Sequence, residues 1–344
     1  SLPEGLYTLV YSYVGYEPQT RNIQLLTSQK VDIELTPGVA LGEVEVIGRK
    51  DSVPRLSESV QMSQLSLRPT TVKDVPMLFG EKDVLKTLQL MPGVQSGSEG
   101  SAGLYVRGGG PDQNLIMLDD AIVYNAFHLF GFFSLFNGDA LKTIELTKGG
   151  FPARFGGRLS SVLEMRSKEG NKERIRGEGG IGLLSSRLTV EGPIWKDKTS
   201  FIVSGRRSYI DLITRPFMRP DEQFGYFFYD GKAKINHTID DKNKLYLSGY
   251  FGRDQFSARN NGESFDSKFG TWWGNQTGTL RWNHIATENL FLNISIIYSK
   301  YSFNTFFKEK DLVQNKTSDL NFRSGIEDWT IKTDADYFWS STHT

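Results

Sequence analysis

The sequence contains no cysteine among its 344 residues, so it has neither a disulfide scaffold nor a thiolate metal site. It has no surplus of charge either, because 40 Lys and Arg balance 40 Asp and Glu. A balanced charge gives no electrostatic footprint for binding nucleic acid or an anionic surface. No run approaches the roughly 20 apolar residues of a membrane-spanning helix. No signal peptide opens the chain, so we expect any targeting signal to lie upstream.

Signals of catalysis and metal binding are also missing. The 4 histidines are His128, His237, His284 and His343. No two of them have a ligand spacing such as i, i+4, so we predict no metal site. The run Gly177–Gly182 matches G-x-G-x-x-G, but strand-like alternation follows it instead of the helix that a dinucleotide site requires. Glycines at close backbone contacts in a barrel explain this run better. No nucleophile–base constellation is visible, so we expect no enzyme activity and no cofactor.

What the sequence does have is aromatic residues, glycine and long alternating runs. Aromatics make up 12%, with 23 Phe and 14 Tyr, beside 35 glycines, a mixture that suits outer-membrane barrels. After residue 172, apolar and polar residues alternate in runs of about 10 or more, most clearly in Asn289–Tyr301 and Trp329–Trp339. Leu292, Ile294 and Ile296 then fall on one face, which we expect to meet lipid, with polar residues on the other.

The turns support a barrel as well. Short turns are predicted at Trp195–Lys198, Asp240–Asn243 and Thr287–Asn289, and longer polar connections around 210–225, 255–270 and 305–320. Short turns at one rim and long loops at the other are the bacterial outer-membrane pattern, and we count about eight strands. The alternative is a soluble β-sandwich, whose strands are mostly only about 5–6 residues long.

Composition and pattern divide the chain into four segments. Residues 1–36 read as a small β-unit, 37–66 as a linker with a short extended run, 67–168 as a mixed α/β domain and 169–344 as barrel strands. In the third segment, Asp83–Met91 is predicted to be a helix that ends at Pro92 and Gly93. Short strands are predicted at 104–107, 115–118, 143–147 and 162–165.

Motifs in the third segment occur in the order found in the plug domain of TonB-dependent receptors, which this segment resembles. The similar positions are Pro92, Gly93, Arg107, Gly108, Leu118, Asp119, Asp120, Arg154, Phe155, Gly156, Gly157 and Arg158. Ala121 stands where the family usually has glycine.

Two upstream segments resemble parts of Bacteroidota transporters of this family. Residues 1–36 resemble the second half of a carboxypeptidase-regulatory-like β-sandwich, whose name implies no peptidase chemistry. The short extended run resembles the TonB box, with Glu43, Val44, Glu45, Val46 and Ile47.

The resemblance implies a mainly β fold: a transmembrane antiparallel β-barrel with a mixed α/β plug and a partial β-sandwich at the N-terminus. Family barrels have about 22 strands, so we expect this chain to be the N-terminal portion of a longer protein. The implied function is TonB-dependent import of a nutrient across the outer membrane, with the N-terminal domain periplasmic. The implied partners are TonB, outer-membrane lipids and a surface lipoprotein or other outer-membrane subunits, but no nucleic acid.

Two other functions stay open. One is a plugged barrel that no longer transports and acts as a scaffold or assembly subunit with lipoprotein partners. The other is a soluble β-rich adhesin. The substrate is open as well, since glycan, peptide and chelated metal all fit the sequence.

The run Phe127–Phe136 is the most aromatic stretch of the plug-like segment. It is either a substrate-contacting apex or packing between plug and barrel, and the large area that aromatics bury favours packing. Phe127, His128 and Phe130 are the candidate substrate contacts, with His128 expected to be an exposed polar contact.

A group of arginines surrounds the predicted junction of plug and barrel: Arg154, Arg158, Arg166, Arg206 and Arg207. A buried guanidinium needs carboxylate partners. We therefore predict ion pairs that hold the plug to the barrel wall, with Glu145, Glu164 and Glu178 as the carboxylates.

Overall fold

The structure is a computed structural model that describes residues 5–11, 19–25, 27, 31, 33, 63–75, 83–97, 103–219, 221–262 and 264–339. The chain divides into two compact units, residues 1–58 and residues 59–344. The TonB-box run Glu43–Ile47 lies outside the described residues, so its assignment stays a prediction.

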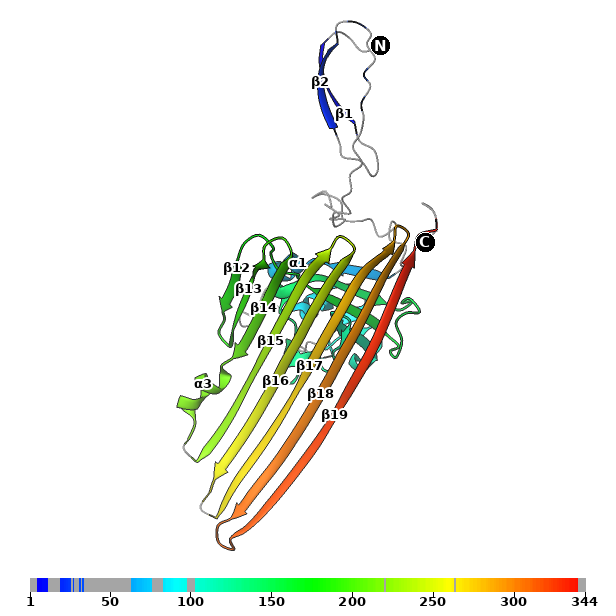
Figure 1. The fold of residues 1–344 in the computed structure, drawn as a ribbon. Helices are drawn as coiled ribbons and strands as arrows, with labels where there is room; N and C mark the ends of the chain where they lie inside the picture. The colour runs from blue at the N-terminus through cyan, green and yellow to red at the C-terminus, as the bar shows by residue number, and fades with distance from the viewer. Residues whose placement is uncertain are drawn as a thin grey trace. The chain divides into compact units, whose positions relative to one another are not determined.

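The first unit contains an antiparallel hairpin of β1 (Gly5–Tyr11) and β2 (Gln19–Leu25), blue in Figure 1. The Thr8 hydroxyl donates to Asn22 Oδ1 across this pair at 2.8 Å. Strand β1 alternates in exposure along its whole length, as half-buried strands do, and β2 alternates in its second half. Two strands do not decide which β-domain they belong to, so the regulatory-like assignment stays a prediction.

The second unit begins with the plug-like segment, whose centre is a five-stranded sheet in the order β3-β10-β11-β6-β7. Its strands are β3 (Gln64–Leu67), β6 (Asn114–Leu118), β7 (Ala121–Ile122), β10 (Leu141–Lys148) and β11 (Ser161–Ser167). Strand β11 runs parallel to β6, and the other pairs are antiparallel. The segment is therefore mixed α/β, as the sequence predicts.

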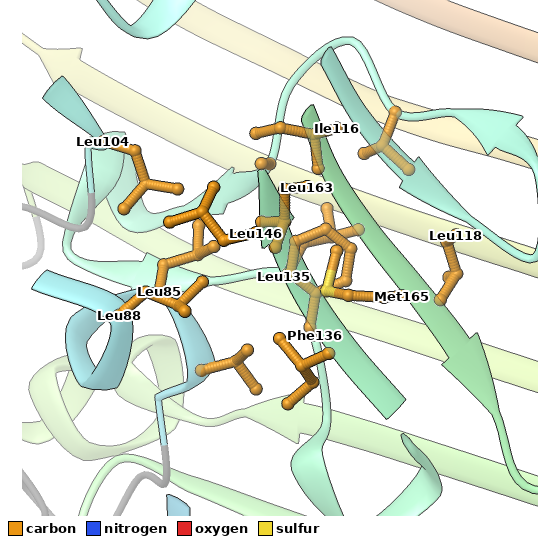
Figure 2. Close-up of a cluster of buried hydrophobic side chains, with 14 of the residues drawn as sticks. Leu85, Leu88, Leu104, Ile116, Leu118, Leu135, Phe136, Leu146, Leu163 and Met165 are labelled. Carbon is orange, nitrogen blue, oxygen red and sulfur yellow. The ribbon is translucent and has the colours of Figure 1, made fainter. Parts of the chain in front are cut away.

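Short elements surround this sheet. They are α1 (Pro69–Asp74), α2 (Val84–Gln89), β4 (Val94–Gln95), β5 (Tyr105–Val106), η1 (Pro111–Gln113), β8 (Phe127–His128), η2 (Leu129–Gly131), β9 (Phe133–Ser134) and η3 (Gly138–Ala140). Helix α2 starts at Asp83, whose carboxylate accepts the Lys86 amide at 3.0 Å. Its Leu85 and Leu88 are completely buried and belong to the same apolar cluster as Leu146 (Figure 2).

The rest of the second unit is an eight-stranded antiparallel sheet, here called the wall, with its strands in chain order (Figure 1). Its strands are β12 (Arg176–Ile181), β13 (Ser185–Trp195), β14 (Thr199–Ser208), β15 (Glu222–Asp240), β16 (Asn243–Asn261), β17 (Phe265–Thr287), β18 (Leu290–Asp311) and β19 (Lys316–Tyr337). The predicted strand count is confirmed, and so are the three short turns. The run Gly177–Gly182 lies on β12 and the bend after it, with no helix following.

Two of the predicted long connections are wrong. Strands β16, β17, β18 and β19 continue through most of 255–270 and 305–320 and are joined by short connections. Charged and polar residues are frequent there, which hides the apolar alternation, but backbone pairing does not depend on it. The connection around 210–225 does contain a longer excursion, with α3 (Ile210–Thr214) and η4 (Arg215–Phe217).

The wall has two different faces. The side chains of Arg206, Asp230 and Asp254 point toward the plug, which defines the inward face. On the outward face, one row of paired positions is apolar on every strand from β14 to β19: Phe201, Ile235, Leu247, Leu280, Ile296 and Ile331. The expected contact of Leu292, Ile294 and Ile296 with lipid stays a prediction, but all three share this face.

No helix in the described part of the chain is both long and apolar enough to cross a membrane.

Candidate functional site

The aromatic run meets the wall through a strained turn at η2. Leu129 and Phe130 have φ angles of 50° and 53°, and Gly131 has 100°. Non-glycine residues rarely adopt this left-handed backbone. The Leu129 amide donates to the Tyr226 hydroxyl at 2.6 Å and to Asp254 Oδ1 at 3.0 Å. These bonds from two wall strands hold the turn and leave the Phe130 side chain 64% exposed.

His128, next to this turn, is completely buried between two wall carboxylates. Its Nδ1 lies 2.7 Å from Asp254 Oδ2 and its Nε2 lies 3.2 Å from Asp230 Oδ2. Arg206 Nε donates to the same Asp230 oxygen at 2.8 Å, and the imidazole stacks on Phe228 with ring centroids 4.2 Å apart. Burial disfavours the charged imidazole, but the two carboxylates outweigh it and raise the pKa of His128. The expectation of an exposed contact at His128 is wrong, because these partners enclose the ring.

A second polar anchor centres on Asp119 of the plug. Its carboxylate lies 3.6 Å from Lys232 Nζ and 3.4 Å from Lys234 Nζ, both on β15. It also accepts the Ser167 amide at 3.0 Å, and the Asp119 carbonyl accepts from the Thr279 hydroxyl at 2.9 Å. Burial opposes ionisation, but the two lysines and Ser167 lower the pKa of Asp119 below its ordinary range.

Two further plug aspartates also face wall cations. Asp120 contacts Arg281 of β17 and lies 3.8 Å from Lys332 of β19. Asp139 lies 2.8 Å from Arg187 of β13. The plug thus presents carboxylates to cations on several wall strands, and each pair is at least partly buried.

The predicted pairs between arginines and glutamates include one that forms, Arg166 with Glu164, but this pair does not join plug and wall. Of the two wall arginines in this group, Arg206 reaches the plug, where it donates to the Ser134 carbonyl at 3.0 Å. Its carboxylate partner is Asp230 of the wall. Arg166 pairs with Glu164 on its own strand at 2.7 Å. Arg207 pairs with Asp211 at 3.0 Å, on the outward side.

The plug-motif residues occupy turns and strand ends. Gly93, Arg107, Gly108 and Gly157 have positive φ, which explains glycine at three of these positions. Lys148 Nζ donates to the Pro92 carbonyl at 2.6 Å. Leu118 ends β6, and Arg154, Phe155, Gly156 and Arg158 lie in the connection from β10 to β11. The part of all these residues in function stays a prediction.

Beside the η2 turn, plug and wall together line a cavity of about 440 Å³. The plug contributes Phe127 and Phe130, and the wall contributes Phe269, Trp273, Tyr301 and Phe303. The Phe130 ring lies 4.8 Å from the Trp273 ring. We call this the shared cavity. Two of the three predicted substrate contacts line it, whereas the buried His128 does not.

The polar groups at the shared cavity mostly bond within the protein. Asn125 Oδ1 accepts the Phe127 amide at 3.1 Å, and the Asn125 carbonyl accepts from Asn275 Nδ2 at 2.7 Å. The hydroxyls of Thr271 and Thr305 each donate to a backbone carbonyl. Across the described residues, no three His, Asp or Glu side chains gather as metal ligands would.

Sequence reasoning missed the aspartates that anchor the plug to the wall, although Asp119 and Asp120 lie in a recognised motif. An Asp-Asp pair next to an apolar strand was a usable signal, because buried carboxylates need cationic partners. Nothing in the local sequence pointed to Lys232 and Lys234 as those partners.

Comparison with known proteins agrees with this architecture. Residues 68–161 match the family model described as TonB-dependent Receptor Plug Domain. Among solved structures, the chain resembles the siderophore receptor PiuA from Acinetobacter baumannii, with a TM-score of 0.51 and 14% identity over 79% of this chain and 42% of that chain. It resembles the copper transporter OprC with a TM-score of 0.50 and 10% identity over 81% and 53%.

The siderophore receptor PirA from Acinetobacter baumannii also matches, with a TM-score of 0.42 and 13% identity over 83% of this chain. This chain spans 60% of PirA, 42% of PiuA and 53% of OprC. At such identities the likeness concerns the fold. Residues 68–161 therefore carry the sequence match to this plug domain, and the segment lies against the inward face of the wall.

Proposed function

We propose that this chain forms the plug and adjoining barrel wall of a TonB-dependent importer in an outer membrane. The observation that carries the proposal is the shared cavity, whose aromatic lining comes from both plug and wall. A ligand there touches a part that must move and a part that stays fixed. Its binding energy therefore depends on how the plug sits, which is the condition for coupling ligand binding to plug movement.

The nature of the plug–wall contact supports the same proposal. Asp119 meets Lys232 and Lys234, and Asp120 meets Arg281, through ion pairs. These pairs lie apart from the aromatic cluster in which Phe133 of the plug packs against the wall. Polar contacts can be exchanged for water when the plug moves, whereas exposed apolar surface has no such replacement. We infer a plug that is held firmly at rest and released under force.

The proposal also covers the closure of the barrel and the N-terminal segments. The edge strands β12 and β19 carry backbone groups that must be paired within lipid, so we propose that the wall is a sector of a closed barrel of about 22 strands. We also propose a Bacteroidota-type organisation, with a periplasmic regulatory-like domain at residues 1–36, a TonB box at Glu43–Ile47 and a surface lipoprotein among the partners.

Uptake in a deletion strain tests the proposal. Complementation with the full-length gene is expected to restore energy-dependent uptake of one member of a nutrient panel of glycans, peptides and metal chelates. Val46→Pro removes an N–H and fixes φ, so it blocks strand pairing with TonB. We expect it to abolish uptake at normal surface abundance and ligand binding.

Val46→Ala is the matched control, because it keeps the N–H and is expected to transport. Wild-type uptake by Val46→Pro would show that Glu43–Ile47 is only a linker. A protein that binds ligand and partners but never transports would favour the scaffold alternative.

A further inference from the structure

The inward face of the wall is mostly apolar from the shared cavity toward the rim that bears the β18–β19 turn. Three successive rows of paired positions across β16 to β19 make up this part of the face. The rows are Asp254, Trp273, Phe303 and Ser324; Phe256, Thr271, Thr305 and Phe322; and Ala258, Phe269, Phe307 and Leu320. The interior of a membrane barrel is ordinarily polar, so this lining needs an explanation. We call the three rows the aromatic track.

Neighbouring rings join the plug to the aromatic track. The Phe130 ring of the plug lies 4.8 Å from the Trp273 ring of the first row and 6.2 Å from the Phe256 ring of the second. The Phe256 ring lies 6.1 Å from the Phe269 ring of the third row. Trp273 and Phe269 are four positions apart on β17, or about 13 Å. The rings therefore form a continuous surface from the strained η2 turn to the third row.

The outer part of the aromatic track is open to a ligand. Phe269, Phe307, Leu320 and Phe322 are between 39% and 65% exposed, although they lie on the face that the plug covers farther along the strands. Large apolar side chains that stay exposed together are a mark of binding sites. This surface continues into the shared cavity, where Phe269 is also a lining residue.

The aromatic track offers no charge to a ligand. Its three rows contain no lysine or arginine, and nearby cations such as Lys268 belong to the outward face. Asp254 is the one ionisable side chain in the rows, and it is bound by His128 and by the Leu129 amide. Beyond the third row, the next inward residue of β18 is Glu309. An anionic ligand therefore meets no cation in the track, and a cationic ligand meets no free carboxylate.

The track also offers few hydrogen bonds. The Thr271 hydroxyl donates to the Asn304 carbonyl at 3.2 Å, and the Thr305 hydroxyl donates to the Gly270 carbonyl at 3.3 Å. A sugar ring carries several hydroxyl groups, and each of them needs a partner when it leaves water. The lining therefore fits the apolar faces of a ring system better than a glycan.

We propose that the aromatic track and the shared cavity bind a substrate through an uncharged aromatic ring system. The ring contacts the exposed side chains of the third row first and moves along the track into the shared cavity, where it packs beside Trp273 and Phe130. Offset and edge-to-face ring contacts are favourable at each step. Because Phe130 belongs to the plug, a ring in the cavity contacts the strained turn directly. This inference rests on the proposed function, in which the inward face lines the lumen of an importer, and it names the substrate class.

The test measures probe binding to the full-length protein in detergent by equilibrium dialysis. Protein-free micelles in the opposite chamber correct for uptake of the probe by the detergent. The probes are 2-naphthol, which is uncharged at neutral pH, naphthalene-2-sulfonate, which has the same rings and a fixed negative charge, and maltose. We expect saturable binding of 2-naphthol, at least about tenfold weaker binding of the sulfonate, because its charge would lose water without gaining a partner, and no binding of maltose.

A double variant tests the outer part of the aromatic track. Phe269→Ala with Phe307→Ala is expected to weaken 2-naphthol binding about tenfold, because both side chains supply ring contacts. The control is Phe251→Ala with Phe306→Ala, the same change on the outward face of neighbouring strands. It is expected to bind 2-naphthol as the wild type does.

A single variant tests the plug end of the site. Phe130→Ala keeps the Cβ atom and removes the ring beside Trp273, so it is expected to weaken 2-naphthol binding several-fold. Phe132→Ala is the control, because Phe132 belongs to the same aromatic run and is exposed but does not line the shared cavity. It is expected to match the wild type.

Equal affinity for 2-naphthol and its sulfonate would overturn the proposal, and so would 2-naphthol binding that is unchanged in both inward variants. Maltose binding that is lost in Phe269→Ala with Phe307→Ala would mean a glycan track and would overturn it too. Energy-dependent uptake of a nutrient by a protein that does not bind 2-naphthol selectively would leave the importer intact and remove only this inference. Selective 2-naphthol binding without uptake of any nutrient would keep the aromatic site and remove the importer.

Discussion

His128 is a single residue on which the contact between plug and wall depends. It joins the plug to two wall strands through Asp254 and Asp230, and Arg206 shares the second carboxylate. An apolar side chain would fill the same space but would leave two buried carboxylates with less compensation. The adjacent left-handed residues Leu129 and Phe130 keep their strained backbone only while these contacts persist.

The pH dependence of this contact follows from the direction in which the pKa of His128 is shifted. The pKa of folded His128 is raised by Asp254 and Asp230 despite burial and the nearby Arg206. The stabilisation by charged His128 is therefore complete below the ordinary histidine pKa and is lost as the pH rises through the raised value. We expect amide exchange in residues 127–136, corrected for intrinsic rates, to increase as the pH rises above neutral.

His128→Gln is expected to cost about 3–5 kcal/mol of plug stability, because it breaks a buried charge network, and to remove this pH dependence. His284→Gln is the control, since that imidazole bonds to Asn243 at 2.8 Å away from the plug. If His128→Gln kept the pH profile of the wild type, another group would be titrating.

Strand β17 shows that the position of an outward side chain along a strand determines its surroundings. Leu280 lies on the outward face within the apolar row, and Gln276 lies on the same face four positions away, in register with Lys300. Both side chains are exposed, so mutations there do not disturb the plug. Their different surroundings come only from their heights on the strand.

We expect Leu280→Arg to destabilise the membrane-inserted protein by about 2–4 kcal/mol and Gln276→Arg by about 0–1 kcal/mol. Urea unfolding from lipid vesicles measures both. Equal losses at the two positions would contradict a lipid-facing row and would favour a wall that packs against protein.

At the scale of the whole molecule, the strands are longer than a membrane requires. Strands β15 to β19 have 19 to 23 residues, against about 9–11 for a transmembrane strand. The extra length lies on the side of the β18–β19 turn, because the apolar row lies nearer the opposite rim. This geometry predicts a wall that projects into the medium outside the cell.

Cysteines introduced at two turns test this topology, because these 344 residues contain no other cysteine. We expect Gln314→Cys, in the exposed β18–β19 turn, to react with a membrane-impermeant maleimide on intact cells. Lys196→Cys, in the exposed β13–β14 turn, is expected to react only after lysis. The opposite labelling pattern would invert the proposed orientation, and labelling of both in intact cells would argue against a membrane barrel.

The sequence by itself determined the features that depend on neighbouring residues. Alternation and turn residues predicted the eight strands and the short turns, and the helix before Pro92 and Gly93 followed from periodicity and a stop signal. These signals act over a few residues, because side-chain direction and turn geometry repeat locally. The same local basis explains the error at 255–270 and 305–320, where polar strands look like loops.

Only the tertiary structure decided which charges meet. His128 and Asp254 are 126 positions apart, and Asp119 and Lys234 are 115 positions apart. No local pattern encodes such a pair, because it depends on the register of the wall and on where the plug sits against it. The local sequence therefore determines the strands. The ion pairs between plug and wall form only in the folded protein, because a buried carboxylate or cation is stable only when an opposite charge compensates it.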